Sequence, residues 1–126
     1  MNMFCFDIET LGIESTTVVL SAAIIHFDAE VDANISFKEL VQRGLLVKFD
    51  AKDQVKRLDR TMSKSTLDWW GKQGSYQQKL SFAPDASRDV TTEDGLQAIR
   101  KYINQYHRGA DPQTMTIWAR GSLDQM

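Results

Sequence analysis

Two carboxylates near the start of the chain have the spacing of a metal site. Asp7 and Glu9 are two residues apart in a short apolar segment that breaks at Gly12. Successive side chains of a β-strand point to opposite faces, so both carboxylates point the same way and can share a divalent cation. Their mutual repulsion on a partly buried face is compensated by a hard cation such as Mg²⁺ or Mn²⁺. The pattern indicates a metal site. The alternative is that Asp7 caps a turn and Glu9 stays solvated at a strand end.

The elements that must position this pair have a mixed α/β order. Apolar runs predict strands over residues 3–8 and 17–27, and an interrupted or bulged strand over 35–49. Together they predict an antiparallel meander. A capped amphipathic helix is expected over 91–107, followed by a strand over 115–119 that pairs parallel to the first.

Shorter helices are expected between the meander and the long helix. A capping-box pattern predicts one over residues 65–74, and a second helical stretch is expected over 76–80. Active sites of open α/β sheets gather at the carboxyl ends of their strands. Asp7 and Glu9 end one strand and Asp124 follows another, so we expect the three carboxylates to converge.

Composition limits the classes of protein that fit. With 126 residues, 42% of them hydrophobic, the chain is expected to form one domain over residues 1–126. A formal charge of −2 gives no global basic field, so a nucleic-acid partner needs a local patch, a metal or stacking. The single cysteine, Cys5, cannot form an internal disulfide. No leader or membrane span is evident, so we expect a cytoplasmic protein with no membrane partner.

Several motifs together resemble one nuclease family. Asp7-Ile8-Glu9-Thr10 with Gly12 is similar to the first motif of the DEDD (proofreading-type) exonucleases, within the ribonuclease H-like superfamily. The segment WARGSLD, which ends at Asp124, is similar to the second motif. With LVQRG, VKFD and STLDWW between them, the resemblance spans nearly the whole chain and is closest to a phage exonuclease of the family.

The resemblance implies an activity and a metal site. It implies a 3'-to-5' exonuclease that uses two Mg²⁺ or Mn²⁺ ions on the single-stranded 3' end of DNA or RNA. One ion lowers the pKa of the attacking water, and the other stabilises the leaving 3' oxygen. Asp7, Glu9 and Asp124 match three of the four acidic ligands as catalytic and metal-binding residues. It also implies a ribonuclease H-like mixed sheet with flanking helices, in the host cytoplasm if the protein is phage-encoded.

The family's contacts to the terminal nucleotide follow its first motif. They map onto Thr10 as a backbone donor, Leu11 as an apolar wedge against the base, and Gly12 as a small residue that allows close approach. For Leu11 the alternative is simple core packing.

Other candidate contacts rest on the residues themselves. Trp69 and Trp70 are about 100° apart on a helix, so one is expected in the core while the other, assigned to Trp69, stacks on a base. Arg120 is expected to contact a phosphate or an acidic ligand, or to be a plain surface residue. The basic residues within 48–64 either contact phosphates or form a solvated loop.

One part of the family pattern is missing. Family members carry a third motif, with a His or Tyr and a final Asp, but this sequence ends two residues after Asp124. His107 and Asp111 have a similar spacing but precede the second motif, so they are interpreted as a helix end and a loop. The domain is therefore expected to be incomplete at its carboxyl end, to self-associate and to cleave weakly. The alternative function is a non-catalytic ribonuclease H-like module that binds nucleic acid or a partner protein.

Overall fold

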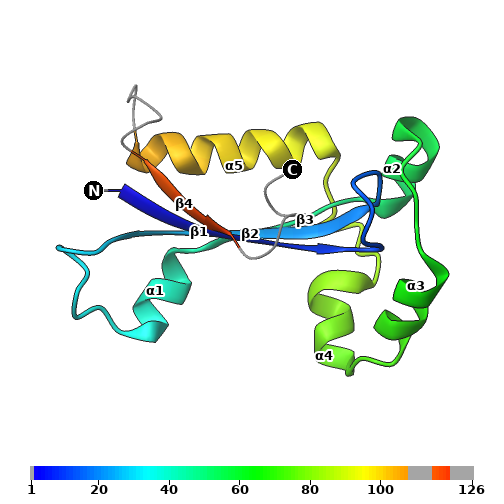
Figure 1. Cartoon of the computed structure of the whole chain (residues 1–126), viewed down its shortest axis with the longest axis horizontal. Helices are drawn as coiled ribbons and strands as arrows, with labels where there is room; N and C mark the ends of the chain where they lie inside the picture. Colours follow the sequence, from blue (N-terminus) through cyan, green and yellow to red (C-terminus); the bar gives the residue numbers. More distant parts are fainter. Residues whose placement is uncertain (1, 108–114, 120–126) are drawn as a thin grey trace.

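A mixed β-sheet with helices on both sides forms the protein. The computed structural model describes residues 2–107 and 115–119. Within those ranges the sheet has four strands in the order β3-β2-β1-β4 (Figure 1). The strands are β1 (Asn2–Thr10), β2 (Val19–Asp28), β3 (Leu45–Lys48) and β4 (Thr116–Ala119).

The central position of β1 follows from its pairing on both edges. It pairs antiparallel with β2 along its whole length and parallel with β4, where Phe6 lies opposite Ala119. β3 pairs antiparallel with β2. The predicted antiparallel meander with one parallel strand is confirmed.

The long helix α5 (Thr92–Tyr106) covers one face of this sheet, which we call the α5 face (Figure 1). Its start is capped as predicted, because the side chain of Thr91 accepts a hydrogen bond from the backbone of Asp94. Gly95 lets the helix approach closely, since a Cβ at this position would overlap the ring of Phe49. The main core lies between α5 and the sheet, and its buried residues are Phe4, Ala22, Ile24, Val47, Phe49, Ile99 and Tyr102.

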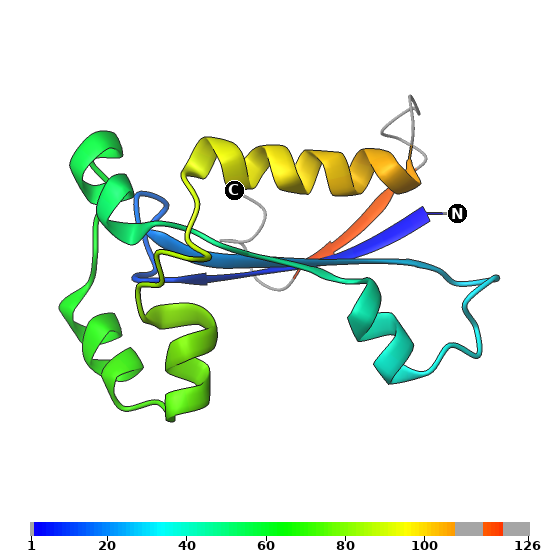
Figure 2. The ribbon, with the colours of Figure 1, turned by 180° about the vertical axis from the view of Figure 1, so that it is seen from behind.

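Shorter helices flank the other side and one end of the sheet (Figures 1 and 2). They are α1 (Phe37–Arg43), α2 (Ala51–Leu58), α3 (Lys64–Gly71), α4 (Ser75–Gln77) and a π-helical turn, η1 (Gln78–Phe82). A second core cluster, with Leu11, Val18, Leu20 and Trp70 buried, joins the end of β1 and the start of β2 to these helices. No helix of the described segments is long and apolar enough to cross a membrane.

Two predictions about secondary structure were wrong, and a cap explains each. Residues 37–43 form α1 instead of a strand, because the Ser36 hydroxyl accepts from the Glu39 amide at 3.1 Å. α2 occupies sequence interpreted as a charged loop, and Asp50 caps it by accepting from the Asp53 amide at 3.0 Å. α3 begins at Lys64, with Ser63 at the N-cap position.

Candidate active site

Asp7 and Glu9 project from the face of β1 that points away from α5. Alternation along the strand places Phe6 and Ile8 on the α5 face and the two acids on the opposite face. Asp7 lies opposite Ala23 of β2 and is exposed, whereas Glu9 lies opposite Ser21 and is half-buried. Residues two apart on a strand are separated by about 6.8 Å. The two side chains can therefore reach toward a common point in front of the sheet.

The end of β1 is held by α3. The backbone amide of Ser63 donates to the Leu11 carbonyl at 2.7 Å, and Trp70 Nε1 donates to the Thr10 carbonyl at 3.2 Å. The side chain of Leu11 is 2% exposed and packs in the cluster that contains Trp70. Burial corrects the wedge assignment of Leu11, since a buried side chain does not reach a base. The core-packing alternative is what the structure shows.

Contacts within the protein also explain why Thr10 and Gly12, the two neighbours of Leu11, stand at these positions. Thr10 Oγ1 donates to the Gly12 carbonyl at 2.7 Å, which closes a local turn. Gly12 is buried, and a Cβ there would lie 2.8 Å from Thr17 Oγ1. The close approach at Gly12 is thus made by Thr17 of the same chain.

The same loop exposes an apolar residue that the motifs did not indicate. The Ile13 side chain is 88% exposed directly after Gly12, where polar residues would be expected. An isolated β-branched residue before the polar run 14–17 is a weak sequence signal for such a position. Ile13 offers the exposed apolar contact that Leu11 does not.

The structure separates the two adjacent tryptophans. Trp70 is 5% exposed and its ring stacks on Phe82 with centroids 5.7 Å apart. Trp69 is 54% exposed, although its ring meets Trp70 edge-on at 5.1 Å. Trp70 is a core residue, whereas Trp69 is half exposed. The helix α3, which carries both, lies on the side of the sheet away from α5 (Figure 1).

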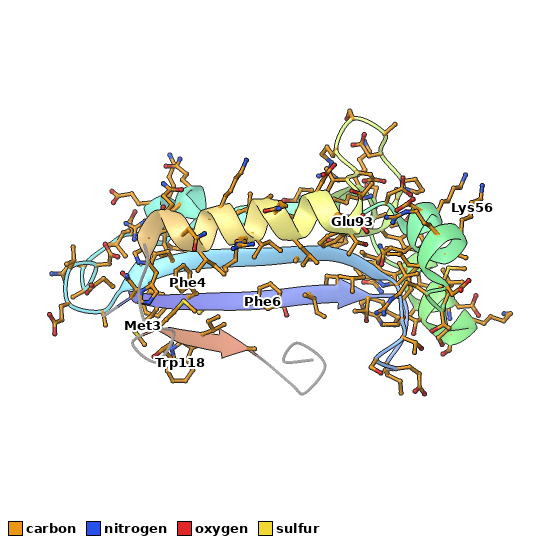
Figure 3. The ribbon with its side chains drawn as sticks, turned by 90° about the horizontal axis from the view of Figure 1, so that it is seen from above. Met3, Phe4, Phe6, Lys56, Glu93 and Trp118 are labelled. Atoms are coloured by element: carbon orange, nitrogen blue, oxygen red, sulfur yellow. The ribbon has the colours of Figure 1, made fainter. Side chains whose placement is uncertain are left out.

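Most of the basic residues within 48–64 are engaged inside the protein. Lys48 is buried in an ion pair with Asp89 at 2.6 Å, and Arg60 donates to backbone carbonyls. Arg57 and Lys64 pair with acidic side chains on the surface. Within residues 48–64, the exposed cations for which the structure shows no ion pair are Lys52 and Lys56 on α2. Figure 3 labels Lys56.

The parallel strand β4 ends beside the part of β1 that precedes the acids. Ala119, its last residue, lies opposite Phe6, one position before Asp7. Arg120 and Asp124, like Asp111, lie outside the described residues. Over residues 2–107 and 115–119, no group of three or more His, Cys, Asp or Glu side chains is placed to hold a metal ion.

The donor chemistry of the acid pair fits a hard cation. Carboxylate oxygens are the ligands that Mg²⁺ and Mn²⁺ prefer, and two of them on one open face form part of such a site. His107 does not contribute, because it ends α5 and its ring Nδ1 lies 3.1 Å from the side-chain nitrogen of Asn2.

The chain is similar to two known nucleases. The chain is 37% identical over 118 residues to the exodeoxyribonuclease of Enterobacteria phage T4, a match that covers 94% of this chain and 49% of that protein. It therefore spans about half the length of this curated relative. Among solved structures, cell-death related nuclease 4 (CRN-4) matches with a TM-score of 0.57 and 16% identity, over 98% of this chain and 36% of that one. The structural match supports the ribonuclease H-like fold.

The family assignment covers almost every residue. Residues 2–125 match a single domain family. The matched stretch includes β1, which carries Asp7, and the neighbouring strand β4. The chain belongs to the 3'-5' exoribonuclease Rv2179c-like domain family.

Proposed function

We propose that this domain is a metal-dependent 3'-to-5' exonuclease that hydrolyses terminal phosphodiester bonds of single-stranded nucleic acid. The observation that carries the proposal is the pair Asp7 and Glu9 on one open face of β1, beside the point where β4 ends. The family description supports the polarity and names RNA, while the name of the phage T4 relative refers to DNA. Both nucleic acids are therefore substrates to assay.

The proposed metal ligands are Asp7, Glu9 and Asp124. Two Mg²⁺ or Mn²⁺ ions at such a site supply activation of water and stabilisation of the leaving 3' oxygen. The protein contributes the fixed direction of the first two carboxylates, set by β1, and their support by α3 through the carbonyls of Thr10 and Leu11. Arg120, next along the chain after β4, is proposed to contact a phosphate.

Substrate contacts are proposed for side chains that the structure leaves exposed. Trp69 presents a ring surface on which a base can stack, a contact worth about 1–3 kcal/mol per base. Ile13 takes the apolar contact with the terminal base. Lys52 and Lys56 attract phosphates along α2, and the backbone amide of Thr10 remains a proposed donor.

A cleavage assay tests the polarity and the exonuclease assignment. Single-stranded DNA and RNA carrying a 5' label are incubated with excess protein and Mn²⁺ or Mg²⁺, with a circular single strand as control. We expect slow, stepwise shortening of the linear strands from the 3' end, no cleavage of the circle, and full inhibition by EDTA. Cleavage in EDTA, or cutting of the circle, would contradict the proposal.

A substitution at the first carboxylate tests the metal site. Asp7→Asn keeps the shape of the side chain but removes the charge that holds the cation, so we expect loss of the 3' shortening and at least about tenfold weaker Mn²⁺ binding by electron paramagnetic resonance. Glu30→Gln removes an exposed acid from another part of the fold and should change neither. Unchanged turnover in Asp7→Asn would refute the two-metal assignment.

A non-catalytic binding module is the second candidate. One observation favours it. Among the described residues, only two acidic side chains, Asp7 and Glu9, lie at the proposed site, and no group of three or more possible metal ligands is found. Such a module would bind a single-stranded oligonucleotide with Mn²⁺ present and leave it intact even with excess protein. Weak binding that is insensitive to both Asp7→Asn and Trp69→Ala would contradict this candidate as well.

The proposed site of action is the cytoplasm, that of the bacterial host if the protein is phage-encoded. Cys5 is the sole cysteine of the chain and is an exposed free thiol, which suits a reducing compartment.

A further inference from the structure

A hollow of about 520 Å³ lies between the α4–η1 segment and the loop that follows it. Tyr76, Lys79 and Leu80 line it from the helical side, and Pro84 and Arg88 line it from the loop. Its volume falls within the range of small-molecule sites in proteins, which is about 300–1,000 Å³. We call it the Tyr76 hollow.

Hydrogen bonds hold the two walls of the Tyr76 hollow together. Arg88 Nη2 donates to the Lys79 carbonyl at 2.6 Å, and Arg88 Nε donates to the Asp85 carboxylate at 3.1 Å. The Ser87 hydroxyl donates to the same carboxylate at 2.6 Å. Because the loop is tied both to itself and to η1, the hollow is formed before a ligand binds, and little ordering entropy is lost on binding.

The helical wall of the hollow has an irregular backbone. In the π-helical turn η1, the Ala83 amide donates to the Gln78 carbonyl, five residues earlier in the chain, at 2.6 Å. Turns of this kind are rare and frequently occur at functional sites. η1 supplies Lys79 and Leu80 to the hollow, so the irregular turn and the lining coincide.

The side chains around the hollow match the parts of a nucleotide. Tyr76 is 71% exposed and offers a flat ring on which a base can stack. Leu80 and Pro84 add apolar contact beside the ring. Lys79 is exposed, and no ion pair of it is found within the described residues, so its charge can meet a phosphate.

The charge of the hollow also suits a phosphate. Its charged lining residues are Lys79, Asp85 and Arg88. The Asp85 carboxylate is paired with the Arg88 guanidinium, so its negative charge is compensated within the loop. The ammonium group of Lys79 therefore leaves the hollow with a net positive charge.

The hollow is connected to the strand that carries the acid pair. α4 lies with α3 on the side of the sheet away from α5, the side to which Asp7 and Glu9 point (Figures 1 and 2). η1 is joined to α3 by the stack of Phe82 on Trp70, and Trp70 in turn donates to the Thr10 carbonyl at the end of β1. The hollow and the acids thus belong to one packed unit.

We propose that the Tyr76 hollow binds one nucleotide of a single-stranded nucleic acid whose 3' end lies at the acid pair. The base stacks on the Tyr76 ring, and Lys79 contacts a phosphate beside it. This nucleotide is upstream of the bond to be cleaved, so the contact raises the affinity for the strand without touching the reacting atoms. The inference rests on the proposed exonuclease function and adds a site for the part of the strand that is not being cleaved.

Fluorescence anisotropy tests the stacking contact. The full chain is titrated at low salt, in EDTA, into a 5'-labelled single strand, as DNA and as RNA. Tyr76→Ala removes the ring, so we expect the affinity to fall at least about fivefold, whereas Tyr76→Phe keeps the ring and should bind like the wild type. Phe37→Ala is the matched control, because it removes a ring of 80% exposure from α1 and should leave the affinity unchanged. Circular dichroism melts establish that the variants are folded.

Salt dependence tests the phosphate contact separately. Lys79→Gln removes one cation from the strand's path, so the slope of log affinity against log salt should become shallower by about 0.7. Lys101→Gln removes an exposed lysine from α5, on the other side of the sheet, and should leave the slope unchanged.

Several results would overturn the proposal. A wild-type chain that binds neither strand shows that the hollow holds no nucleotide. Binding that Tyr76→Ala leaves unchanged places the strand on another surface, and equal losses in Tyr76→Ala and Tyr76→Phe exclude stacking as the cause. Binding of a free mononucleotide that needs the Tyr76 ring, with strand binding that does not, assigns the hollow to a free nucleotide instead.

The cleavage assay keeps this test apart from the proposed function. If Tyr76→Ala binds strands as the wild type does, while the wild type shortens them in a manner that depends on Asp7, only the present inference fails. If the wild type never cleaves but its binding depends on Tyr76, the exonuclease assignment fails and the hollow remains the strand-binding site of a non-catalytic module.

Discussion

Gly12 shows how tightly the loop after the acidic pair is packed. An added methyl group would lie 2.8 Å from Thr17 Oγ1 and 3.3 Å from Thr17 Cβ, and Thr17 is itself buried. We predict that Gly12→Ala lowers the free energy of unfolding by about 1–3 kcal/mol in urea titrations, the usual cost of overpacking. Gly71→Ala is the matched control, because a methyl group added there would meet nothing within 4 Å and alanine favours a helix. Equal effects of the two substitutions would contradict the packing argument.

His26 couples the fold to pH. It is buried, its ring stacks on Tyr106 with centroids 3.9 Å apart, and its Nε2 lies 3.0 Å from Asn2 Oδ1. Burial, followed by the charge of Arg43, holds the pKa of His26 below its ordinary value of 6.5, although Asp32 and Asp28 act in the opposite direction. The ring is therefore preferentially neutral in the folded state.

A pH titration of stability checks this effect. Because the folded pKa of His26 is depressed, the unfolded chain binds a proton that the folded chain does not. The stabilisation is fully present above the unfolded pKa of 6.5 and is lost as the pH falls through that value toward the folded pKa. We predict a lower urea midpoint at about pH 5.5 than at about pH 7.5, and a smaller difference in His26→Gln. An unchanged difference in the variant would exclude His26 as the cause.

At the scale of elements, one buried ion pair joins β3 to the loop before α5. The side chains of Lys48 and Asp89 are 3% and 9% exposed, with 2.6 Å between Nζ and Oδ1. We predict that Asp89→Ala costs about 3–5 kcal/mol of folding free energy, because it leaves the lysine charge buried and unpaired. Asp68→Ala, which breaks the exposed pair with Lys64, should cost only about 0.3–0.5 kcal/mol. Urea titrations of both variants measure the difference, and similar losses would contradict the prediction.

Elements with a strong local signal were predictable from the sequence. β2 is a long Val- and Ile-rich run, and α5 combines a capping box with apolar periodicity, so both were found within a few residues. α1 was missed because its apolar residues were assigned to a strand, although Ser36 and Glu39 have capping-box spacing. α2 was missed because charged residues dominate it. Ala51 and Val55 tie it to the core, and the buried Gln54 ties it to β2.

The same reasoning explains what was predictable at the site. Strand alternation is a local property, so the common direction of Asp7 and Glu9 followed from their spacing alone. Whether Leu11 or Ile13 is exposed depends on how the loop packs against α3, and nothing in the two residue types decides it. The convergence of Asp124 with the acid pair stays a prediction, because Asp124 lies outside the described residues.

At the scale of the whole molecule, the sheet face that carries the acids leaves apolar side chains in solvent. Trp118 of β4 is 56% exposed beside Cys5, and Leu46 of β3 is 42% exposed. Exposed apolar surface and open strand edges favour association. We predict that the mass of the isolated chain, measured by light scattering, rises with concentration, and that Trp118→Lys reduces this rise. Trp69→Lys, at a tryptophan of similar exposure, is the control. A stable monomer at high concentration would contradict the prediction.

The pairing of β1 with β4 constrains when the fold can form. β1 leaves the ribosome before β4, yet one of its two edges pairs with the strand containing Thr116, which lies opposite Met3. A contact between residues so far apart in sequence carries a large loop-closure entropy and slows folding. During synthesis β1 and β2 can form a hairpin early, while the β1 edge that precedes Asp7 stays unpaired until β4 has been made. Chains released before β4 has been made would therefore expose an unpaired strand edge next to the acid pair. Such an edge can pair with another chain, so incomplete chains are prone to misassembly.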